Sequence, residues 1–226
     1  EGNAAVPMLS LNILCSSKEN ETAGLMFANS LNIPVKYIEF GSELYHDRLN
    51  YLDEFPSAES YALKCNEWAA FIKSIPGFQN YKIAAVGAQP NSDPVFSRRN
   101  SWTKKVTDVL TSSVDAITLH YYNSGRWGKY ADTEQNLHIM FQAPFEQIAD
   151  EKPNFDMARA KKKEVWITEY NHYDRGRCLH DTWAHGLFLA TQTLTFLEDT
   201  IITKALCHTI TTDARMGCLF NDSNGL

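Results

Sequence analysis

The 226-residue sequence lacks the features that mark several classes of protein. No apolar run approaches the roughly 18 residues that a membrane-spanning helix needs. The N-terminus lacks the basic segment leading into an apolar one that is typical of a signal peptide. Basic residues are in the minority, since 21 Lys and Arg face 27 Asp and Glu and the net charge is −6. Because an acidic chain repels a phosphate backbone, we expect neither nucleic acid nor a membrane as a partner.

Close pairs of cysteines are also missing. The five cysteines are scattered, without the short spacings of a zinc site or a disulfide framework, and we interpret them mainly as small buried apolar residues: Cys15, Cys65, Cys178, Cys207 and Cys218. No metal or cofactor is therefore expected. The chain begins at Glu1 and not at a methionine, so we expect a processed or truncated N-terminus. Its location stays open, with a secreted or periplasmic one favoured.

What is present is the composition of an ordinary folded protein, 44% apolar and 21% charged. Short β-favouring runs alternate with longer segments of helical periodicity, which predicts a parallel sheet covered by helices. The expected strands are 6–14, 35–40, 81–88, 115–122, 164–170 and 205–210, and the expected helices are 18–31, 58–75, 97–111, 133–148 and 182–197.

Six strand–helix units are fewer than the eight of a closed (β/α)₈ barrel. An open doubly wound sheet is the alternative, and it predicts a glycine-rich phosphate loop after an early strand. The turn that follows Leu14, CSSKENET, contains no glycine. We therefore prefer a partial (β/α)₈ TIM barrel. Since no linker divides the sequence, residues 1–226 are expected to form one domain.

Two carboxylates follow β-favouring runs that lie far apart in the chain. Residues 35–45, VKYIEFGSELY, deliver Glu43 where the first run should end, and residues 164–171, EVWITEYN, deliver Glu169. Active sites of barrels form at the carboxyl ends of the strands. A glycosidase needs one carboxyl group to protonate the leaving oxygen and a second to attack the anomeric carbon. This pair predicts glycosidic bond chemistry, and the less favoured alternative is that each glutamate is a solvated loop carboxylate.

Three motifs in this order carry a family resemblance. IEFGSELY resembles the strand-four signature of the retaining glycoside hydrolases of clan A, ITLHYY resembles their strand-six segment, and VWITEYN resembles their strand-seven signature; the α-L-arabinofuranosidase group is the most similar in type. The resemblance implies that Glu43 is the acid/base and Glu169 the nucleophile. It also implies a catalytic barrel domain that is a fragment, with strands three to eight present and the first two missing.

The resemblance and the strand ends together suggest further site residues. Tyr122 is expected to donate a hydrogen bond to Glu169, and His120 to bind a sugar hydroxyl. Glu39 shares strand parity with Glu43, so it should be buried and need a donor. The expected substrate-binding residues are Ser42, His120, Tyr122, Trp127, Asn171 and His208, with Trp127 and Tyr130 offering aromatic faces for stacking.

One residue departs from the pattern of the clan. Ser42 stands where an asparagine usually binds the sugar 2-hydroxyl, and a hydroxyl offers a single donor. The substrate is therefore open. Alternatives are a carbohydrate-binding pseudoenzyme with the same barrel and another clan A glycosidase of β-xylosidase, β-glucuronidase or agarase type. A metal-dependent barrel hydrolase that uses the histidines is a third reading, although their spacing is not that of a zinc helix motif.

Overall fold

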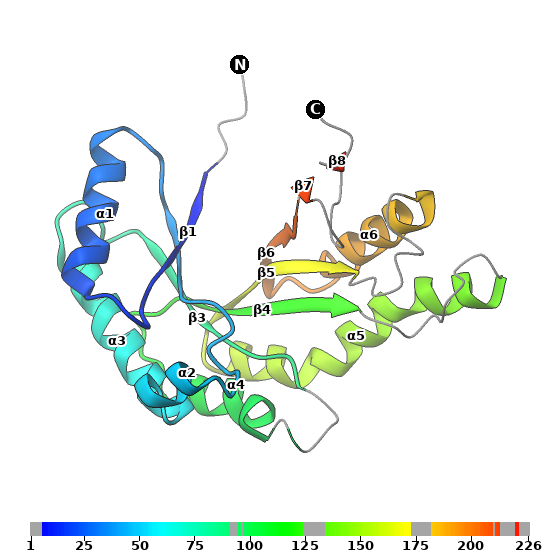
Figure 1. Cartoon of the computed structure of the whole chain (residues 1–226), viewed down its shortest axis with the longest axis horizontal. Helices are drawn as coiled ribbons and strands as arrows, with labels where there is room; N and C mark the ends of the chain where they lie inside the picture. Colours follow the sequence, from blue (N-terminus) through cyan, green and yellow to red (C-terminus); the bar gives the residue numbers. More distant parts are fainter. Residues whose placement is uncertain are drawn as a thin grey trace. The chain divides into compact units, whose positions relative to one another are not determined.

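A computed structural model describes residues 6–90, 95, 97–123, 134–172, 182–209, 211–212 and 220–221. Strands and helices alternate along the chain (Figure 1). The strands are β1 (Met8–Leu11), β2 (Tyr37–Phe40), β3 (Lys82–Val86), β4 (Ala116–Asn123), β5 (Glu164–His172), β6 (Ile202–Cys207), β7 (Thr211–Thr212) and β8 (Phe220–Asn221). The helices are α1 (Lys18–Ser30), α2 (Leu49–Glu54), α3 (Ala58–Ser74), α4 (Ser97–Val109), α5 (Glu134–Ala160) and α6 (Trp183–Phe196).

The main sheet has six strands, hydrogen-bonded in chain order from β1 to β6. The pairs β1–β2, β2–β3 and β3–β4 are parallel, and in the β2–β3 pair Ile38 lies opposite Ile83. Sequential parallel strands joined by helices confirm the expected class of fold, part of a (β/α) barrel. Their assignment as strands three to eight stays a prediction.

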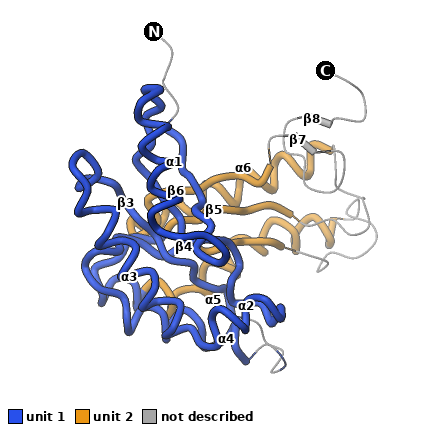
Figure 2. The backbone as a smooth tube through the Cα atoms, turned by 60° about the vertical axis from the view of Figure 1, so that its left-hand side comes forward, with its two compact units in different colours: residues 1–118, 156–165 blue, residues 119–155, 166–226 orange. Residues whose placement is uncertain are grey.

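The chain divides into two compact units (Figure 2). Unit 1 comprises residues 1–118 and 156–165, and unit 2 comprises residues 119–155 and 166–226. The boundary passes through β4, α5 and β5, so these three elements contribute residues to both units. The expectation of a single domain stays a prediction.

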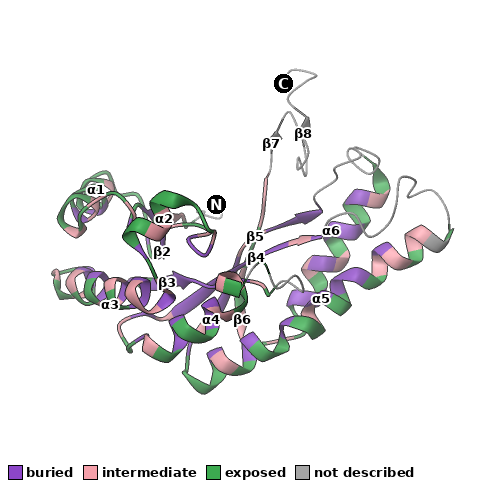
Figure 3. Ribbon diagram, turned by 60° about the horizontal axis from the view of Figure 1, so that its bottom comes forward, coloured by how far each residue is buried: buried purple, intermediate pink, exposed green. Residues whose placement is uncertain are grey.

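In unit 1, α3 packs against α1, α4 and β3. Its inward face is buried, as Figure 3 shows, and Tyr61, Cys65 and Trp68 on this face are at most 3% exposed. The Tyr61 hydroxyl donates to the Phe40 carbonyl oxygen at 2.8 Å and accepts from the Val86 backbone N–H at 2.7 Å. One helix side chain therefore joins the carboxyl ends of β2 and β3.

In unit 2, aromatic side chains connect the strands to α6. Phe196, 2% exposed, makes edge-to-face contacts with Tyr121 of β4 and Tyr170 of β5, at centroid distances of 5.6 and 5.0 Å. Side chains alternate between the two faces of a strand. His120, Tyr122 and Glu169 therefore belong to the opposite strand faces, away from Phe196.

Three expectations for the elements are wrong. The helix expected to end near residue 148 continues to Ala160 through Pro144 and Pro153, because its second half buries Phe155 and Ala158, and this packing outweighs the loss of two backbone hydrogen bonds. The sixth strand is β6, three residues earlier than expected. The short helix α2 was expected to be loop; no residue of it is buried, so the sequence carries little periodic signal there.

The cysteines only partly fit their interpretation as buried apolar residues. Cys65 is fully buried, and burial raises the pKa of its thiol well above the usual range. Cys15 is exposed and Cys207 is half-buried, so neither is a core residue. Cys178 and Cys218 lie outside the described residues. Among the described helices, none has the length and apolarity required to span a bilayer.

Gly41, directly after β2, generates a testable prediction about stability. Its φ is +79°, and a Cβ at this position would lie 2.7 Å from Leu44 Cδ1 and 3.3 Å from Ile13 Cγ2. Gly77 has a φ of +92° but no atom within 4 Å of its virtual Cβ, so it is a matched control. Both alanine variants carry a backbone cost of about 1–2 kcal/mol, and only Gly41→Ala adds a steric clash. Urea unfolding should show a larger loss for Gly41→Ala; equal losses would contradict this packing.

Candidate active site

The segment after β2 places Glu43 in an unusual backbone conformation. Glu43 has a φ of +51°, in the left-handed region that residues with a side chain rarely adopt. The next residues, Leu44 and Tyr45, are buried, at 2% and 3% exposure. Gly41 donates its N–H to the Leu11 carbonyl oxygen at 3.0 Å, and Ser10 Oγ donates to the Gly41 carbonyl oxygen at 3.2 Å. The turn is thus fixed to β1, and it brings Glu43 to a half-buried position beside core residues.

Both carboxylate oxygens of Glu43 contact side chains of the same turn. The Tyr45 hydroxyl donates to Oε1 at 3.1 Å, and His46 Nε2 lies 3.1 Å from Oε2. About one third of the Glu43 side chain is exposed. The carboxyl group is therefore oriented by two donors and still accessible to a ligand. Tyr45 and His46 did not figure among the expected site residues, although their positions two and three residues after Glu43 bring them within reach.

Two neighbours of Glu43 in the sequence differ in their surroundings. Ser42 is exposed, and Glu39 is 6% exposed, in the middle of β2. The burial of Glu39 agrees with the inward parity expected from the sequence. Glu39 lies opposite Ser10 of β1 and Ala84 of β3 in the strand register.

A second cluster of polar side chains, in unit 2, surrounds Glu169. The Tyr122 hydroxyl donates to Glu169 Oε2 at 2.5 Å, the hydrogen bond anticipated from the sequence, and His120 Nδ1 lies 3.5 Å from the same oxygen. His120 is 7% exposed, whereas the Glu169 side chain is 27% exposed. The short distance is typical of a charge-assisted hydrogen bond to an ionised carboxylate. The cluster therefore presents a partly accessible carboxylate in a fixed orientation.

His208, which directly follows β6, extends this cluster by one hydrogen bond. Its Nδ1 lies 2.9 Å from the Tyr122 oxygen. A hydroxyl has one proton, and Tyr122 gives it to Glu169, so the oxygen of Tyr122 accepts from His208. This assigns the proton of the imidazole to Nδ1. The directed chain from His208 through Tyr122 to Glu169 joins three strands at one carboxylate.

Asn171 belongs to a buried network next to this chain. Its side-chain amide donates to the His208 carbonyl oxygen at 2.7 Å, and its Oδ1 accepts from the His172 backbone N–H at 2.6 Å. His185 Nε2 of α6 lies 2.8 Å from the same Oδ1. Asn171 is fully buried, so its amide joins β5, α6 and the residue after β6. Its expected contact with a substrate stays a prediction.

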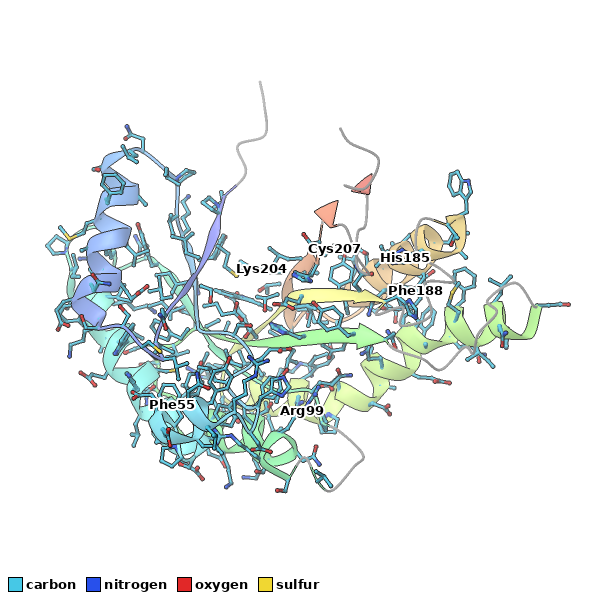
Figure 4. The ribbon with its side chains drawn as sticks, in the orientation of Figure 1. Phe55, Arg99, His185, Phe188, Lys204 and Cys207 are labelled. Carbon is cyan, nitrogen blue, oxygen red and sulfur yellow. The ribbon has the colours of Figure 1, made fainter. Side chains whose placement is uncertain are left out.

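Next to the Asn171 network, His172 packs against two aromatic rings of α6. His172 contacts Phe188 and His185 edge-to-face, at centroid distances of 5.7 and 6.3 Å. Figure 4 labels His185 and Phe188 on α6. His185 was not among the expected site residues, because a single histidine on a mainly apolar helix belongs to no sequence motif. Trp127 and Tyr130, expected as stacking residues, lie outside the described residues.

The structure thus gathers His120, Tyr122, Glu169, His208 and Asn171 in unit 2, while Ser42 and Glu43 lie together in unit 1. A pocket of about 460 Å³ in unit 1 is lined by Asp47, Pro56 and Arg98 among others, but by neither Glu43 nor Glu39. Within the described part of the chain, no group of three or more His, Cys, Asp or Glu side chains is arranged to hold a metal ion.

The fold is shared with solved glycoside hydrolases. An α-L-arabinofuranosidase of family 51 from Bifidobacterium longum matches with a TM-score of 0.70 and 16% identity, over 96% of this chain and 49% of that chain. A 4-O-α-L-rhamnosyl-β-D-glucuronidase from Fusarium oxysporum matches with a TM-score of 0.63 and 16% identity, over 96% and 48% of the two chains.

An endo-β-1,3-glucanase of family 128 from Amycolatopsis mediterranei matches with a TM-score of 0.56 and 13% identity, over 96% of this chain and 76% of that chain. No protein-family model and no curated protein sequence matches the chain. The chain spans about half the length of the arabinofuranosidase and of the glucuronidase. At these identities the likeness concerns the fold, and it agrees with the expected partial (β/α) barrel.

The Asn171 network generates a prediction about stability. Asn171→Ala removes one donor and one acceptor that serve three groups, two of them buried, so we expect the free energy of unfolding to fall by about 2–3 kcal/mol. Asn50, exposed on α2, provides the matched control, and Asn50→Ala should change stability by less than about 0.5 kcal/mol. Urea unfolding measures both. Losses of equal size would mean that the amide of Asn171 does not hold these elements together.

Proposed function

We propose that this chain carries the catalytic carboxylates of a retaining glycoside hydrolase, with α-L-arabinofuranosidases the most similar in type. The observation that carries the proposal is the hydrogen-bonded chain at Glu169, in which Tyr122 donates at 2.5 Å to a carboxylate that remains partly exposed. A buried salt bridge with Lys or Arg would serve stability. A tyrosine hydroxyl instead orients the Glu169 carboxyl group through a hydrogen bond, which suits a nucleophile.

The proposed reaction has two displacements. Glu169 attacks the anomeric carbon while Glu43 protonates the glycosidic oxygen, so the C–O bond breaks and a covalent glycosyl ester forms on Glu169. Glu43, now a carboxylate, then removes a proton from water as the water oxygen attacks the anomeric carbon. The ester bond breaks and Glu169 is released. This mechanism requires the two carboxyl groups to stand about 5 to 5.5 Å apart, a separation that stays a prediction.

The surroundings of the two glutamates support different roles. Both glutamates have a tyrosine and a histidine beside them, but Glu43 lies on the turn after β2, where about one third of its side chain is exposed. Glu169 lies within β5, where the neighbouring strands restrict its movement. A proton donor has to serve two steps, whereas a nucleophile needs one fixed direction of attack. We therefore assign acid/base catalysis to Glu43 and nucleophilic attack to Glu169.

Substitution of the two glutamates tests these roles. Glu169→Gln should abolish turnover of all glycosides, because an amide does not form the glycosyl ester. Glu43→Gln should slow substrates with poor leaving groups by about 10²–10⁴-fold and affect the first step of activated aryl glycosides far less. Steady-state and burst kinetics on both substrate types measure this difference. Normal activity of Glu169→Gln would overturn the proposed function.

Tyr122 offers a prediction with a control in the adjacent residue. Tyr122→Phe removes the hydrogen bond to Glu169, and a loss of about 1.5–3 kcal/mol for a bond to a charged group corresponds to a fall in kcat/KM of roughly 10-fold or more. The Tyr121 hydroxyl is buried and has no hydrogen-bond partner among the described residues. Tyr121→Phe should therefore leave kcat/KM unchanged. Equal effects of the two variants would assign Tyr122 to packing alone.

Ser42 favours a second candidate function. This exposed residue replaces the asparagine that the resemblance leads us to expect, and its shorter side chain has one donor. A carbohydrate-binding protein that has lost turnover would tolerate this change. Calorimetry with arabinose-, xylose- and glucuronate-containing oligosaccharides, followed by product analysis, separates the candidates, since binding without product release supports the second one.

A further inference from the structure

Arg98, in the first turn of α4, binds the backbone of the segment that carries Glu43. One terminal nitrogen, Nη2, donates to the Leu44 carbonyl oxygen at 3.2 Å and to the Phe55 carbonyl oxygen at 2.8 Å. The other, Nη1, donates to the Pro56 carbonyl oxygen at 3.2 Å. A single guanidinium thus joins the residue that follows Glu43 to the loop between α2 and α3, whose Phe55 is labelled in Figure 4.

The guanidinium is itself fixed to the core. Only 12% of the Arg98 side chain is exposed, and its guanidinium carbon lies 4.6 Å from the centroid of the Trp102 ring. Trp102 is fully buried, and its indole Nε1–H donates to the Val86 carbonyl oxygen at the end of β3 at 2.9 Å. Asp47 Oδ1 lies 3.9 Å from Arg98 Nε. The contacts of Arg98 therefore lead from the sheet to the Glu43 turn.

The next residue on α4 supports the same turn at another point. Arg99 lies over the Tyr45 ring at 5.1 Å, and its Nε–H donates to the Gln89 carbonyl oxygen at 2.6 Å; the residue is labelled in Figure 4. Tyr45 in turn donates to Glu43 Oε1. The first turn of α4 thus contacts both residues that immediately follow Glu43.

The backbone of Glu43 explains why such contacts are needed. A residue with a side chain in the left-handed region costs of order 1–3 kcal/mol, and the conformation persists only where the surroundings determine it. The carbonyl of Glu43 accepts the His46 N–H at 3.1 Å, and the Arg98 contact at the Leu44 carbonyl holds the next peptide group; without that contact the turn loses an anchor and relaxes toward a commoner conformation. That relaxation moves the Glu43 carboxyl group, which needs correct placement to within about 1 Å for catalysis.

We propose that Arg98 is a positioning residue for Glu43, acting through the Leu44 carbonyl to hold the acid/base carboxyl group against the leaving oxygen. The proposal rests on the proposed function. Arginine is suited to this task because its planar guanidinium presents donors at fixed angles to several carbonyl oxygens at once. Lysine keeps the charge but lacks this geometry.

The dependence of the rate on the substrate's leaving group distinguishes a positioning role of Arg98 from a general effect on stability. A folding defect lowers the amount of active protein and reduces turnover of every substrate by the same factor. A misplaced acid slows only those substrates whose leaving group needs a proton. The ratio of kcat/KM between poor and activated leaving groups is therefore the quantity that a merely structural role leaves unchanged.

The test compares Arg98→Lys with Arg159→Lys in the whole protein. Arg159 is exposed and pairs with Asp156, so its replacement is a matched control. The substrates are aryl glycosides with leaving groups of graded pKa. For Arg98→Lys we expect a fall of about 10-fold or more on poor leaving groups, a change within about 2–3-fold on activated ones, and an unchanged profile for Arg159→Lys. Equal falls on both types, or no change, would overturn the proposal.

Hydrogen exchange tests the positioning role of Arg98 independently of any catalytic activity. Backbone amides of residues 41–48 should exchange faster in Arg98→Lys than in Arg159→Lys. Unchanged exchange would overturn the positioning role of Arg98 even in an inactive protein. Absence of hydrolysis by the wild type would instead overturn the proposed function.

If Arg98→Lys does not fold, Trp102→Phe provides a second variant, because it removes the indole hydrogen bond and shifts the guanidinium without changing its charge. The same shift in leaving-group dependence is expected there.

Discussion

The turn after β2 is the constraint on which the rest of the candidate site depends. Two consecutive residues have opposite requirements there: Leu44 is buried in the core, while Glu43 has to remain accessible. The φ angles of Gly41 and Glu43 are both positive, so the chain leaves the extended conformation of β2 and meets both requirements. Glycine is needed at Gly41 for a second reason, because the Leu44 side chain occupies the space of its missing Cβ. The position of Glu43 therefore follows from the burial of its neighbour.

Glu169 is held in place by its strand and by side chains of neighbouring segments. It lies inside β5, where the alternation of side chains already determines the face it presents. The hydroxyl of Tyr122 and the imidazole of His208 then select one orientation of its carboxylate. Glu169 does not have a positive φ angle, because the strand supplies its direction. A carboxylate on a strand is thus positioned by neighbouring strands, whereas one on a turn needs contacts to its backbone.

The sequence was sufficient for features that depend on local pattern. Apolar runs and helical periodicity predicted the alternation of strands and helices, strand parity predicted the burial of Glu39, and the family resemblance together with the strand ends predicted the hydrogen bond between Tyr122 and Glu169. It was insufficient where packing overrides local preference, as in α5, which continues through Pro144 and Pro153. It also missed Arg98, because a contact to carbonyl groups more than 40 positions away in the chain leaves no mark on residue types. The sequence did not indicate that Asn171 joins β5, α6 and the residue after β6, because those contacts depend on segments far apart in the chain.

The chemistry of the Arg98 contacts has a consequence for substrate selectivity. Arg98 binds main-chain carbonyl groups, which every residue type possesses. These hydrogen bonds therefore do not depend on the side chains of the turn. Ser42 is exposed and lies on the other side of Glu43 in the sequence from the Leu44 carbonyl. A change at residue 42 therefore leaves the contacts between Arg98 and the carbonyl groups in place. Under the proposed function, Ser42 would bear on the choice of sugar and Arg98 on the placement of the Glu43 carboxyl group.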